Sequence, residues 1–354
     1  MYPYILFHII IILTIFFSYK NRILDEYFSF VLIIISCLFI GGRLEVGADY
    51  TEYRDVFYSY SDTRFEPLFN MIFNLARGSI LSYNTFSFFL YFLSISIFYI
   101  AIKNEKGKVL LLSGFILFMF VPLTSTIRQG LSLPFLALAI YNNQSPKRYF
   151  IYCLLGSFFH ASALILLPLY VICGKYISIY RMAIFILISL IIGYLQPITI
   201  VIKFLETFSI VSGVGNKILT YSTRYNEPMS MIAQLYRVGF ILLLLPIWNV
   251  ISQDRISNFS KNIYIYMFLL TLIFKDNGVL VNRLTFSTNI SCVLILGRLL
   301  YLNFSETKKY FIFVILFLYF SFSYYKFIYT DLRHSVEKAY LPYENGLFID
   351  VSYK

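Results

Sequence analysis

Long apolar runs follow one another along almost the whole chain, and this feature limits the possible folds more than any other. Hydrophobic residues make up 59% of the 354 residues and charged residues only 13%, whereas an ordinary soluble domain is about a quarter charged. Helices this apolar have no polar face to turn towards water, so we expect the bilayer to be the solvent for most of the chain. No polar stretch is long enough to fold outside the membrane. The sequence therefore predicts an all-α protein with one integral membrane domain, residues 1–354.

The apolar runs predict the membrane segments. A spanning helix needs about 20 residues, and several runs are shorter, so some must be broken or re-entrant around a polar cavity. We expect roughly 10–14 transmembrane or re-entrant helices. The first run has no basic segment before it and no small-residue cleavage site after it, so we expect a retained helix rather than a signal peptide. The runs are Pro3–Tyr19, Tyr27–Gly42, Leu68–Ala76, Thr85–Ile102, Val109–Leu123, Thr126–Tyr141, Tyr149–Cys173, Met182–Phe204, Met231–Val250, Ile263–Phe274, Val279–Leu302 and Lys309–Tyr329.

Lysines and arginines in short loops predict the cytoplasmic side. These loops hold Lys20 and Arg22; Lys103, Lys106 and Lys108; Lys147 and Arg148; Lys175 and Arg181; Arg255 and Lys261; Lys308 and Lys309. All of them lie on one side if Leu68–Ala76 does not cross alone and if Tyr149–Cys173 enters and leaves as a hairpin. Attraction of such loops to anionic lipid also explains the net charge of +11, so no nucleic-acid partner is expected.

The opposite, outer face is expected to carry the polar segments at about 41–66, 206–230 and 275–283 and the tail 331–354. This face is rich in arginine, which the usual charge bias disfavours there. Several arginines on a face where this bias disfavours them indicate that an anionic ligand binds there. The four cysteines lie in apolar stretches without CxxC spacing, so they predict neither a disulfide framework nor a metal site.

The first candidate site follows the second apolar run. Gly41 to Tyr53 packs an arginine, three acids and two tyrosines into a short exit loop. Its glycines allow close approach of backbone to a ligand, and the planar fork of Arg43 suits phosphate oxygens. The alternative is an interfacial loop whose charges lie in water.

The second candidate site is the segment Thr124–Gly130. Arg128 lies among hydroxyl side chains at a helix start, where guanidinium and helix N-terminus both favour an anion. The alternative is an arginine that extends to the membrane interface.

His160 is the third candidate: the hairpin would put it near the tip, and a histidine there suits a general base near neutral pH. The alternative is a hydrogen-bonded core histidine.

Two further arginines complete the set. Arg283 follows the polar stretch from Lys275 to Gly278, and Arg237 lies inside its own apolar run. The alternative for these two is a structural ion pair, with Asp276 and Glu227 respectively. Arg43, Arg128 and Arg283 come from separate segments of the outer face, and together they suit a diphosphate. No DxD or HExxH pattern is present, so we expect arginine in place of a metal and no cofactor.

These motifs, taken in order, resemble the EpsG/Wzy-like family of bacterial polysaccharide polymerases. The resemblance covers most of the chain, and its last part is the tail Tyr340-Leu341-Pro342-Tyr343. The other residues that carry it are Arg43, Gly47-Ala48-Asp49-Tyr50, Tyr53, Ile127-Arg128-Gln129, Phe159-His160-Ala161-Ser162-Ala163 and Asn282-Arg283.

The resemblance implies a multi-pass protein of the bacterial cytoplasmic membrane, with a fold similar to membrane-embedded, lipid-dependent (GT-C-like) glycosyltransferases. It implies an outward-facing active site that joins oligosaccharides carried on undecaprenyl diphosphate, with a chain-length regulator and a flippase as possible partners.

The chemistry of the candidate residues then gives a mechanism hypothesis. Arg128, Arg283, Arg43 and Arg237 would hold the diphosphate. His160 or Asp49 would be the general base of an inverting transfer. Contacts with the sugars are expected from Glu45, Tyr50, Tyr53 and Gln129.

Three other classes of protein stay open. An O-antigen-ligase-like transferase would use the same donor but should carry a larger outer domain. A lipid-linked oligosaccharide flippase often shows internal repeats, and none is visible. A membrane scaffold would tolerate replacement of its outer arginines.

Overall fold

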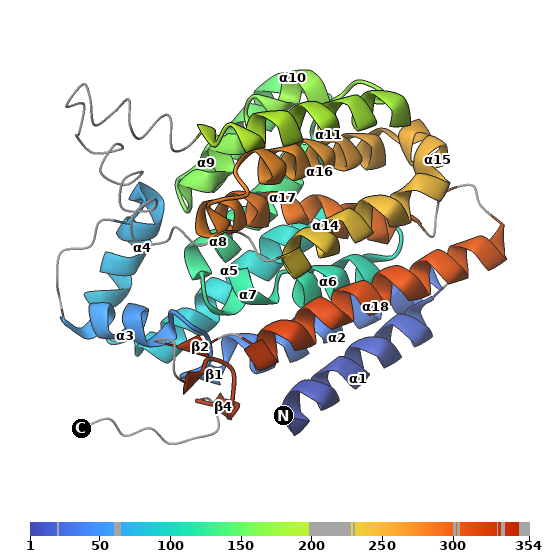
Figure 1. The fold of residues 1–354 in the computed structure, drawn as a ribbon. Coiled ribbons are helices and arrows are strands. Elements are labelled where there is room, and N and C mark those ends of the chain that lie inside the picture. Colours follow the sequence, from blue (N-terminus) through green and yellow to red (C-terminus); the bar gives the residue numbers. More distant parts are fainter. Residues whose placement is uncertain are drawn as a thin grey trace, which may run out of the picture. The chain divides into compact units, whose positions relative to one another are not determined.

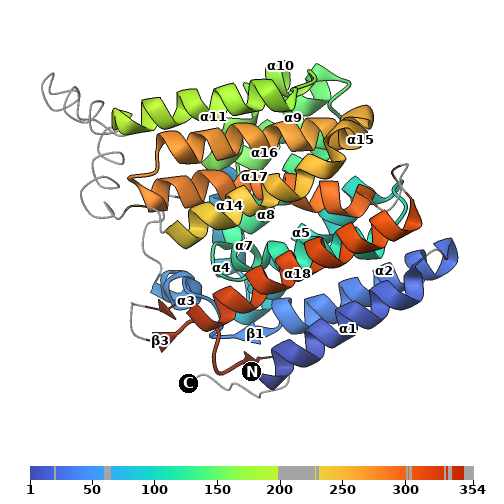
Figure 2. The same cartoon turned by 45° about the vertical axis from the view of Figure 1, so that its right-hand side comes forward.

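The computed structural model describes residues 1–19, 21–59, 65–197, 228, 231–299, 302, 305–330, 332–333 and 337–346. This part of the chain is almost entirely helical (Figures 1 and 2). It divides into two compact units: unit 1 is Met1–Leu167 with Val293–Lys354, and unit 2 is Pro168–Cys292. The all-α prediction is confirmed. The expected segment 206–230 lies outside the described residues, apart from Pro228.

Unit 1 contains the first and last helices of the chain. Short strands pair β1 with β4 and β2 with β3, both antiparallel. Its elements are α1 (Tyr2–Ser18), α2 (Arg22–Ser36), the π-helix η1 (Cys37–Gly41), β1 (Arg43–Leu44), α3 (Tyr50–Ser59), α4 (Pro67–Arg77), α5 (Tyr83–Ile102), α6 (Lys108–Phe118), α7 (Phe120–Thr124), α8 (Ile127–Tyr141), α9 (Pro146–Ser157), the 3₁₀ helix η2 (Ala161–Leu166), α18 (Glu306–Thr330), β2 (Leu332–Arg333), β3 (Glu337–Lys338) and β4 (Glu344–Asn345).

Unit 2 is built around α16, against which α10 and α11 pack. Gly193 of α11 lies so close to α16 that an added Cβ would come within 2.2 Å of the Leu272 carbonyl oxygen. Its elements are α10 (Leu169–Cys173), α11 (Ile179–Tyr194), α14 (Met231–Leu244), η3 (Leu245–Ile247), α15 (Trp248–Gln253), α16 (Arg255–Ile273) and most of α17 (Gly278–Leu299), whose last turns belong to unit 1.

Four stretches are long and apolar enough to cross a membrane: Arg22–Gly41, Tyr83–Ile102, Gln234–Gln253 and Glu306–Thr330. Shorter apolar helices accompany them, and several apolar runs are broken. The run Val109–Leu123 is interrupted between α6 and α7, and the run Tyr149–Cys173 is interrupted around His160. In the second of these, the Tyr149 hydroxyl donates to the Leu166 carbonyl at 2.6 Å, so the chain after the break returns along α9.

The described side chains of unit 1 separate into two ends. At one end, the Asp25 carboxylate accepts from the backbone N–H groups of Lys108 and Val109, at 3.0 and 3.1 Å, and so caps α6. Arg298 pairs with Glu105 at 2.6 Å at the same end. At the other end, which we call the arginine end, α1, α5 and α8 begin and α2 and α7 finish. Arg43 and Arg128 both belong to the arginine end; which side of the membrane it faces stays a prediction.

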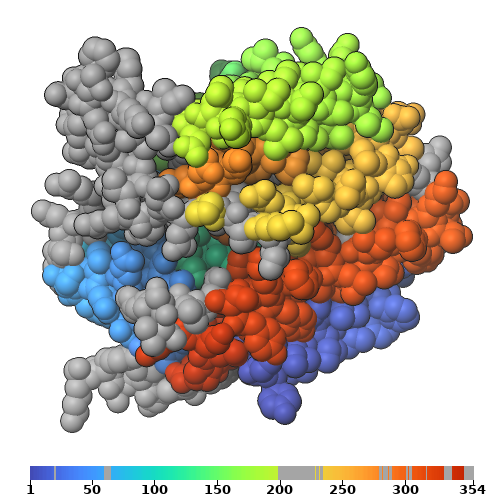
Figure 3. Space-filling model, in the orientation of Figure 1, coloured from blue at the N-terminus to red at the C-terminus, as the bar shows by residue number. Residues whose placement is uncertain are grey.

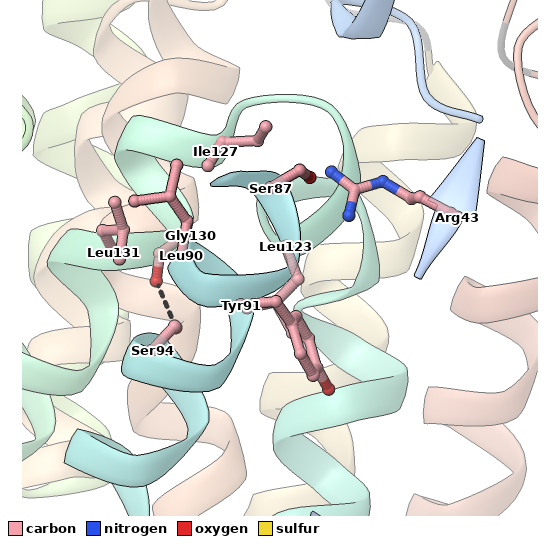
Figure 4. Close-up of a pocket in the computed structure, with 9 residues that line it drawn as sticks. All are labelled: Arg43, Ser87, Leu90, Tyr91, Ser94, Leu123, Ile127, Gly130 and Leu131. Carbon is pink, nitrogen blue, oxygen red and sulfur yellow. Dashed lines mark hydrogen bonds between the residues drawn. The ribbon is translucent and has the colours of Figure 1, made fainter. Parts of the chain in front are cut away.

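The helix α8, which carries Arg128, is fixed by a proline and a glycine. Pro134 has no N–H to give to the carbonyl of Gly130 one turn earlier. The Ser94 hydroxyl of α5 donates to that carbonyl instead, at 2.9 Å (Figure 4). A Cβ on Gly130 would lie 2.5 Å from the Pro122 carbonyl oxygen, so only glycine lets α8 begin this close to α7.

An aromatic cluster supports the arginine end. It joins α3, α4, α5 and the start of α8, and its buried members include Tyr53, Phe57, Phe73, Phe86 and Phe159. The cluster explains why the expected loop at about 41–66 contains the helix α3: Tyr50, Tyr53 and Phe57 are spaced at helical period and bury one face.

The helices α1 and α18 lie side by side on the face drawn in Figure 3. His8 of α1 joins them, with Nδ1 2.8 Å from the Tyr325 hydroxyl and Nε2 3.0 Å from the Ser321 hydroxyl of α18. The long apolar helix α18 is thereby attached to unit 1 by polar contacts as well as by packing.

Candidate functional site

Arg43 is held inside the protein by backbone. Its side chain is 1% exposed. Its guanidinium donates to the carbonyl oxygens of Ile40, Val46 and Thr124, at 2.7, 3.1 and 2.9 Å. Figure 4 shows the guanidinium pointing inward from β1 towards the turn of α5 that carries Ser87. Arg43 thus ties the end of α2, its own loop and the end of α7 together.

Gly47 and the C-terminal segment complete this arrangement. Gly47 has φ +119°, and a Cβ there would lie 2.6 Å from the Thr124 carbonyl oxygen, so no other residue fits without strain. Its N–H donates to the Ala339 carbonyl at 2.7 Å. The Tyr340 hydroxyl lies 2.7 Å from the Ser125 hydroxyl, which accepts from the Ala48 N–H at 2.9 Å. The tail 337–346 therefore fixes the two loops that precede α3 and α8.

Arg128, also at the arginine end, has a partly accessible side chain. Its Nε donates to the Tyr53 hydroxyl at 2.8 Å, and its Nη1 donates to Glu66 Oε2 at 2.6 Å. The guanidinium lies over the Phe65 ring, 4.8 Å from the ring centroid. The side chain is 27% exposed. Within the part of the chain that the structure describes, its Nη2 group makes no hydrogen bond.

Glu66 occupies the N-cap position of α4, but its carboxylate does not cap that helix. The N–H groups of Leu68 and Phe69 donate instead to the Phe158 carbonyl, at 3.2 and 3.3 Å. The carboxylate is thereby left to pair with Arg128 and to accept from the Ala161 N–H at 3.4 Å. An acid at the N-cap position usually accepts hydrogen bonds from the first N–H groups of its helix. Because the Glu66 carboxylate instead pairs with the partly buried Arg128, we interpret it as part of a functional site.

His160 adjoins the same carboxylate, with Nδ1 3.3 Å from Glu66 Oε1. Extended backbone at His160, between α9 and η2, directs its ring towards α4. Burial alone would raise the pKa of Glu66. The close approach of His160 and the charge of Arg128 outweigh burial and lower the pKa of Glu66 to about 2, so the group is ionised at neutral pH.

Tyr53 links Asp49 to this cluster. Burial raises the pKa of the Tyr53 hydroxyl, the nearby charge of Arg128 lowers it, and Asp49 and Glu66 raise it further. Asp49 precedes α3 directly, and its carbonyl accepts from the Tyr53 N–H at 3.1 Å. Of the two proposed bases, His160 lies beside Glu66 and Asp49 lies near Tyr53. We call Arg128, Tyr53, Glu66 and His160 the Arg128 site.

The proposed sugar-contacting residues have different surroundings. Tyr50 is fully buried, and its hydroxyl donates to the Asn84 side chain. Glu45 forms an ion pair with Arg54 of α3. Gln129 is 1% exposed and accepts from the Thr126 hydroxyl at 3.5 Å. Of this set, Tyr53 accepts a hydrogen bond from the Arg128 side chain.

Arg237 and Arg283 belong to unit 2, which is described by itself. Arg237 lies half-buried in α14, and its carbonyl accepts from the Tyr264 hydroxyl at 3.2 Å. Arg283 lies in the second turn of α17, and its side chain is outside the described set. Glu227, the alternative partner of Arg237, also lies outside the described residues. Their part in a diphosphate site stays a prediction.

Glu66 is the residue that sequence reasoning missed. It was only one acid among several in a polar segment, and Glu66-Pro67 reads as an ordinary helix start, with proline in the first turn. The described residues contain no group of three or more His, Cys, Asp or Glu side chains that could hold a metal ion.

These features define a polytopic helical membrane protein with a charged site at one end of unit 1. Compared with known protein families, residues 26–345 match the EpsG family. The match covers nearly the whole chain, so the protein belongs to the EpsG family, a family of Wzy-like polysaccharide polymerases. This confirms the resemblance of the sequence motifs and implies a glycosyltransferase-type polymerase. No curated protein and no solved structure matches the chain.

Proposed function

We propose that the protein transfers a growing glycan from undecaprenyl diphosphate to the non-reducing end of a lipid-linked repeat unit, on the outer face of the bacterial cytoplasmic membrane. The acceptor hydroxyl oxygen attacks the anomeric carbon, and the bond from that carbon to the diphosphate oxygen breaks. In-line displacement inverts the anomeric centre. The lipid diphosphate leaves with the electron pair, and the acceptor proton passes to a side chain of the protein.

The observation that carries this proposal is the state of Arg128. Tyr53 and Glu66 hold its Nε and Nη1, so the guanidinium plane is fixed, while Nη2 makes no hydrogen bond to any described residue. A fixed, partly exposed guanidinium edge suits a phosphate oxygen. In a site that excludes water, the same charge stabilises the negative charge that develops on the leaving diphosphate, without reorganisation at the moment of reaction.

The position of His160 favours it as the base, with Asp49 as the other candidate. Nδ1 of His160 lies 3.3 Å from Glu66 Oε1. The carboxylate favours the tautomer with its proton on Nδ1, which leaves the lone pair of Nε2 to accept a proton. Glu66 would then orient two groups together: the base that takes the acceptor proton and the arginine that binds the diphosphate. Its negative charge also stabilises the imidazolium that forms during transfer.

Arg43 fits a supporting role in this scheme. Its donors already serve three carbonyl oxygens, so it fixes the loop before α8 rather than contacting the substrate. Arg237 and Arg283 remain further candidates for the diphosphate, as the sequence predicts.

The test compares Arg128→Ala with Arg298→Ala. The control pair Arg298–Glu105 has the same N–O distance, 2.6 Å, and similarly shielded side chains, both 19% exposed, but lies at the opposite end of unit 1. Each purified variant is given a lipid-diphosphate-linked repeat unit, and the products are separated on a gel. We expect Arg298→Ala to give a ladder of repeat units and Arg128→Ala to give none. A full ladder from folded Arg128→Ala would refute the proposal.

A further inference from the structure

Phe65 is an apolar residue beside the charged groups of the Arg128 site, and the Arg128 guanidinium lies over its ring. The guanidinium carbon Cζ is 4.8 Å from the Phe65 ring centroid and 5.9 Å from the Tyr53 ring centroid, so Phe65 is the closer of these two rings. A cation within about 6 Å of an aromatic face is attracted by the quadrupole of the ring, and a planar guanidinium also stacks on such a face. Phe65 therefore covers one face of the group that is proposed to bind the diphosphate.

The order of residues in Phe65-Glu66-Pro67 explains how one short segment reaches two sides of this guanidinium. Proline disfavours helical conformation at the residue before it, and Glu66 is extended, with φ −61° and ψ 149°. Side chains of adjacent residues in extended backbone point in different directions. The Glu66 carboxylate meets Nη1 of Arg128 at 2.6 Å, while the Phe65 ring meets the guanidinium face.

The aromatic cluster fixes the Phe65 ring in turn. The ring centroid lies 5.3 Å from that of Phe69 and 5.2 Å from that of Phe73, at interplanar angles of 78° and 79°. Both contacts are edge-to-face rather than face-to-face, and both partner rings are buried. Because buried neighbours hold the Phe65 ring, the ring can hold the guanidinium in one plane.

Three sides of the Arg128 guanidinium are thus occupied. Tyr53 accepts from Nε, Glu66 accepts from Nη1, and Phe65 covers a face. Nη2 makes no hydrogen bond within the described part of the chain, so its edge is the direction from which an anionic oxygen can approach. A charge that is fixed before the reaction stabilises a leaving group without reorganisation.

We infer that Phe65 is a positioning residue for the transfer: its ring shields one face of Arg128 and holds the guanidinium in the plane that presents Nη2 to the diphosphate. This inference rests on the proposed function and adds to it a residue without polar groups. The alternative is that Phe65 only fills space in the aromatic cluster. In that case a folded variant with an aliphatic side chain would transfer as well as the wild type, and loss of the ring would change stability alone.

The first test compares Phe65→Leu with Phe65→Tyr and with the control Phe86→Leu. Leucine removes the ring face and tyrosine keeps it. Phe86 is a buried member of the same cluster, but the rings near the Arg128 guanidinium are those of Phe65 and Tyr53. Each purified variant is assayed for repeat-unit addition over a range of concentrations of a lipid-diphosphate-linked repeat unit, and its melting temperature is recorded. Phe65→Met replaces Phe65→Leu if that variant does not fold.

We expect kcat to fall about tenfold in Phe65→Leu, as for loss of one cation–π contact in a partly buried site. KM should change by less than about twofold, because the charge of Arg128 stays and only its orientation is lost. Phe65→Tyr should keep the wild-type kcat, and Phe86→Leu should keep it despite a lower melting temperature. A folded Phe65→Leu variant with the wild-type kcat, or an equal loss in Phe65→Tyr, would overturn the inference.

A second readout does not depend on polymer synthesis. Phenylglyoxal modifies arginine side chains, and its rate of reaction at Arg128 is followed by mass spectrometry of peptides, with Arg298 at the opposite end of unit 1 as the internal reference. Without the Phe65 ring both faces of the guanidinium are open, so Phe65→Leu should react severalfold faster at Arg128, and Phe86→Leu should not. Equal rates in wild type and Phe65→Leu would overturn the inference. Faster reaction in Phe65→Leu together with no ladder from wild-type protein would keep Phe65 as the residue that shields Arg128 and remove the proposed function.

Discussion

Replacing Glu66 by Gln tests whether this carboxylate organises the Arg128 site. The amide keeps the shape of the side chain but removes the charge that pairs with Arg128 Nη1 and lies beside His160 Nδ1. The two side chains beside this carboxylate, Arg128 and His160, are 27% and 18% exposed. Exposed ion pairs contribute about 0–1 kcal/mol, and breaking a buried pair costs about 3–5 kcal/mol. For this intermediate burial we expect a loss of about 2 kcal/mol.

This stability loss should appear as a fall in melting temperature of about 2–5 °C in detergent. The effect on catalysis should be much larger. If Glu66 orients both the base and the diphosphate-binding arginine, kcat should fall by about 100-fold or more, as for loss of a general base. The measurement is the initial rate of repeat-unit addition under saturating substrate.

The control for Glu66→Gln is Glu105→Gln, which breaks the pair with Arg298 at the opposite end. We expect a similar fall in melting temperature and an unchanged rate. A Glu66→Gln variant with a wild-type rate would refute the reasoning, and so would a Glu105→Gln variant that lost as much activity.

Four further predictions follow from the geometry. The folded-state pKa of Glu66, about 2, lies below the ordinary 4.5, so the melting-temperature difference between wild type and Glu66→Gln should be full above pH 4.5 and vanish as the pH falls towards 2; a difference that instead grew on acidification would contradict this. Gly47→Ala should destabilise by about 1–3 kcal/mol in thermal unfolding, because of its φ and its close neighbour; an unchanged melting temperature would be the contrary result. Arg43→Ala should lower stability by about 3 kcal/mol through three orphaned carbonyls, and Arg43→Lys should not restore it, as lysine lacks the planar fork. His160→Ala should lower the initial rate of repeat-unit addition by about 100-fold or more, and Asp49→Asn should lower it much less; the reverse pattern would make Asp49 the base.

Hydropathy predicted most of the helices because the bilayer selects them by composition. The apolar runs begin and end within a few residues of most described helices, and the interruption around His160 was expected from loop charges. The helix α3 was not expected, since its polar residues hide the spacing of Tyr50, Tyr53 and Phe57. The helix α3 is stabilised by the aromatic cluster against which it packs. Much of this cluster comes from α4 and α5, so a short stretch of sequence does not reveal it.

The candidate site was predicted only in part, for a similar reason. Arg128 and His160 stood out because ionisable groups are expensive near apolar helices. Glu66 did not, because its role depends on the Phe158 carbonyl taking over the N–H groups of α4. Arg43 was expected to bind phosphate, but its guanidinium donates to backbone carbonyl oxygens. One of these belongs to Thr124, which lies 81 residues further along the chain.

Incubating purified wild-type protein with a matched lipid-diphosphate-linked repeat unit in the presence of EDTA tests whether the protein polymerises this substrate without a divalent metal. We expect a ladder of repeat units, because the proposed stabilisation of the leaving diphosphate by arginine requires no divalent metal. No ladder from a verified substrate, together with transfer of the same lipid across the liposome bilayer, would contradict the account and indicate a flippase.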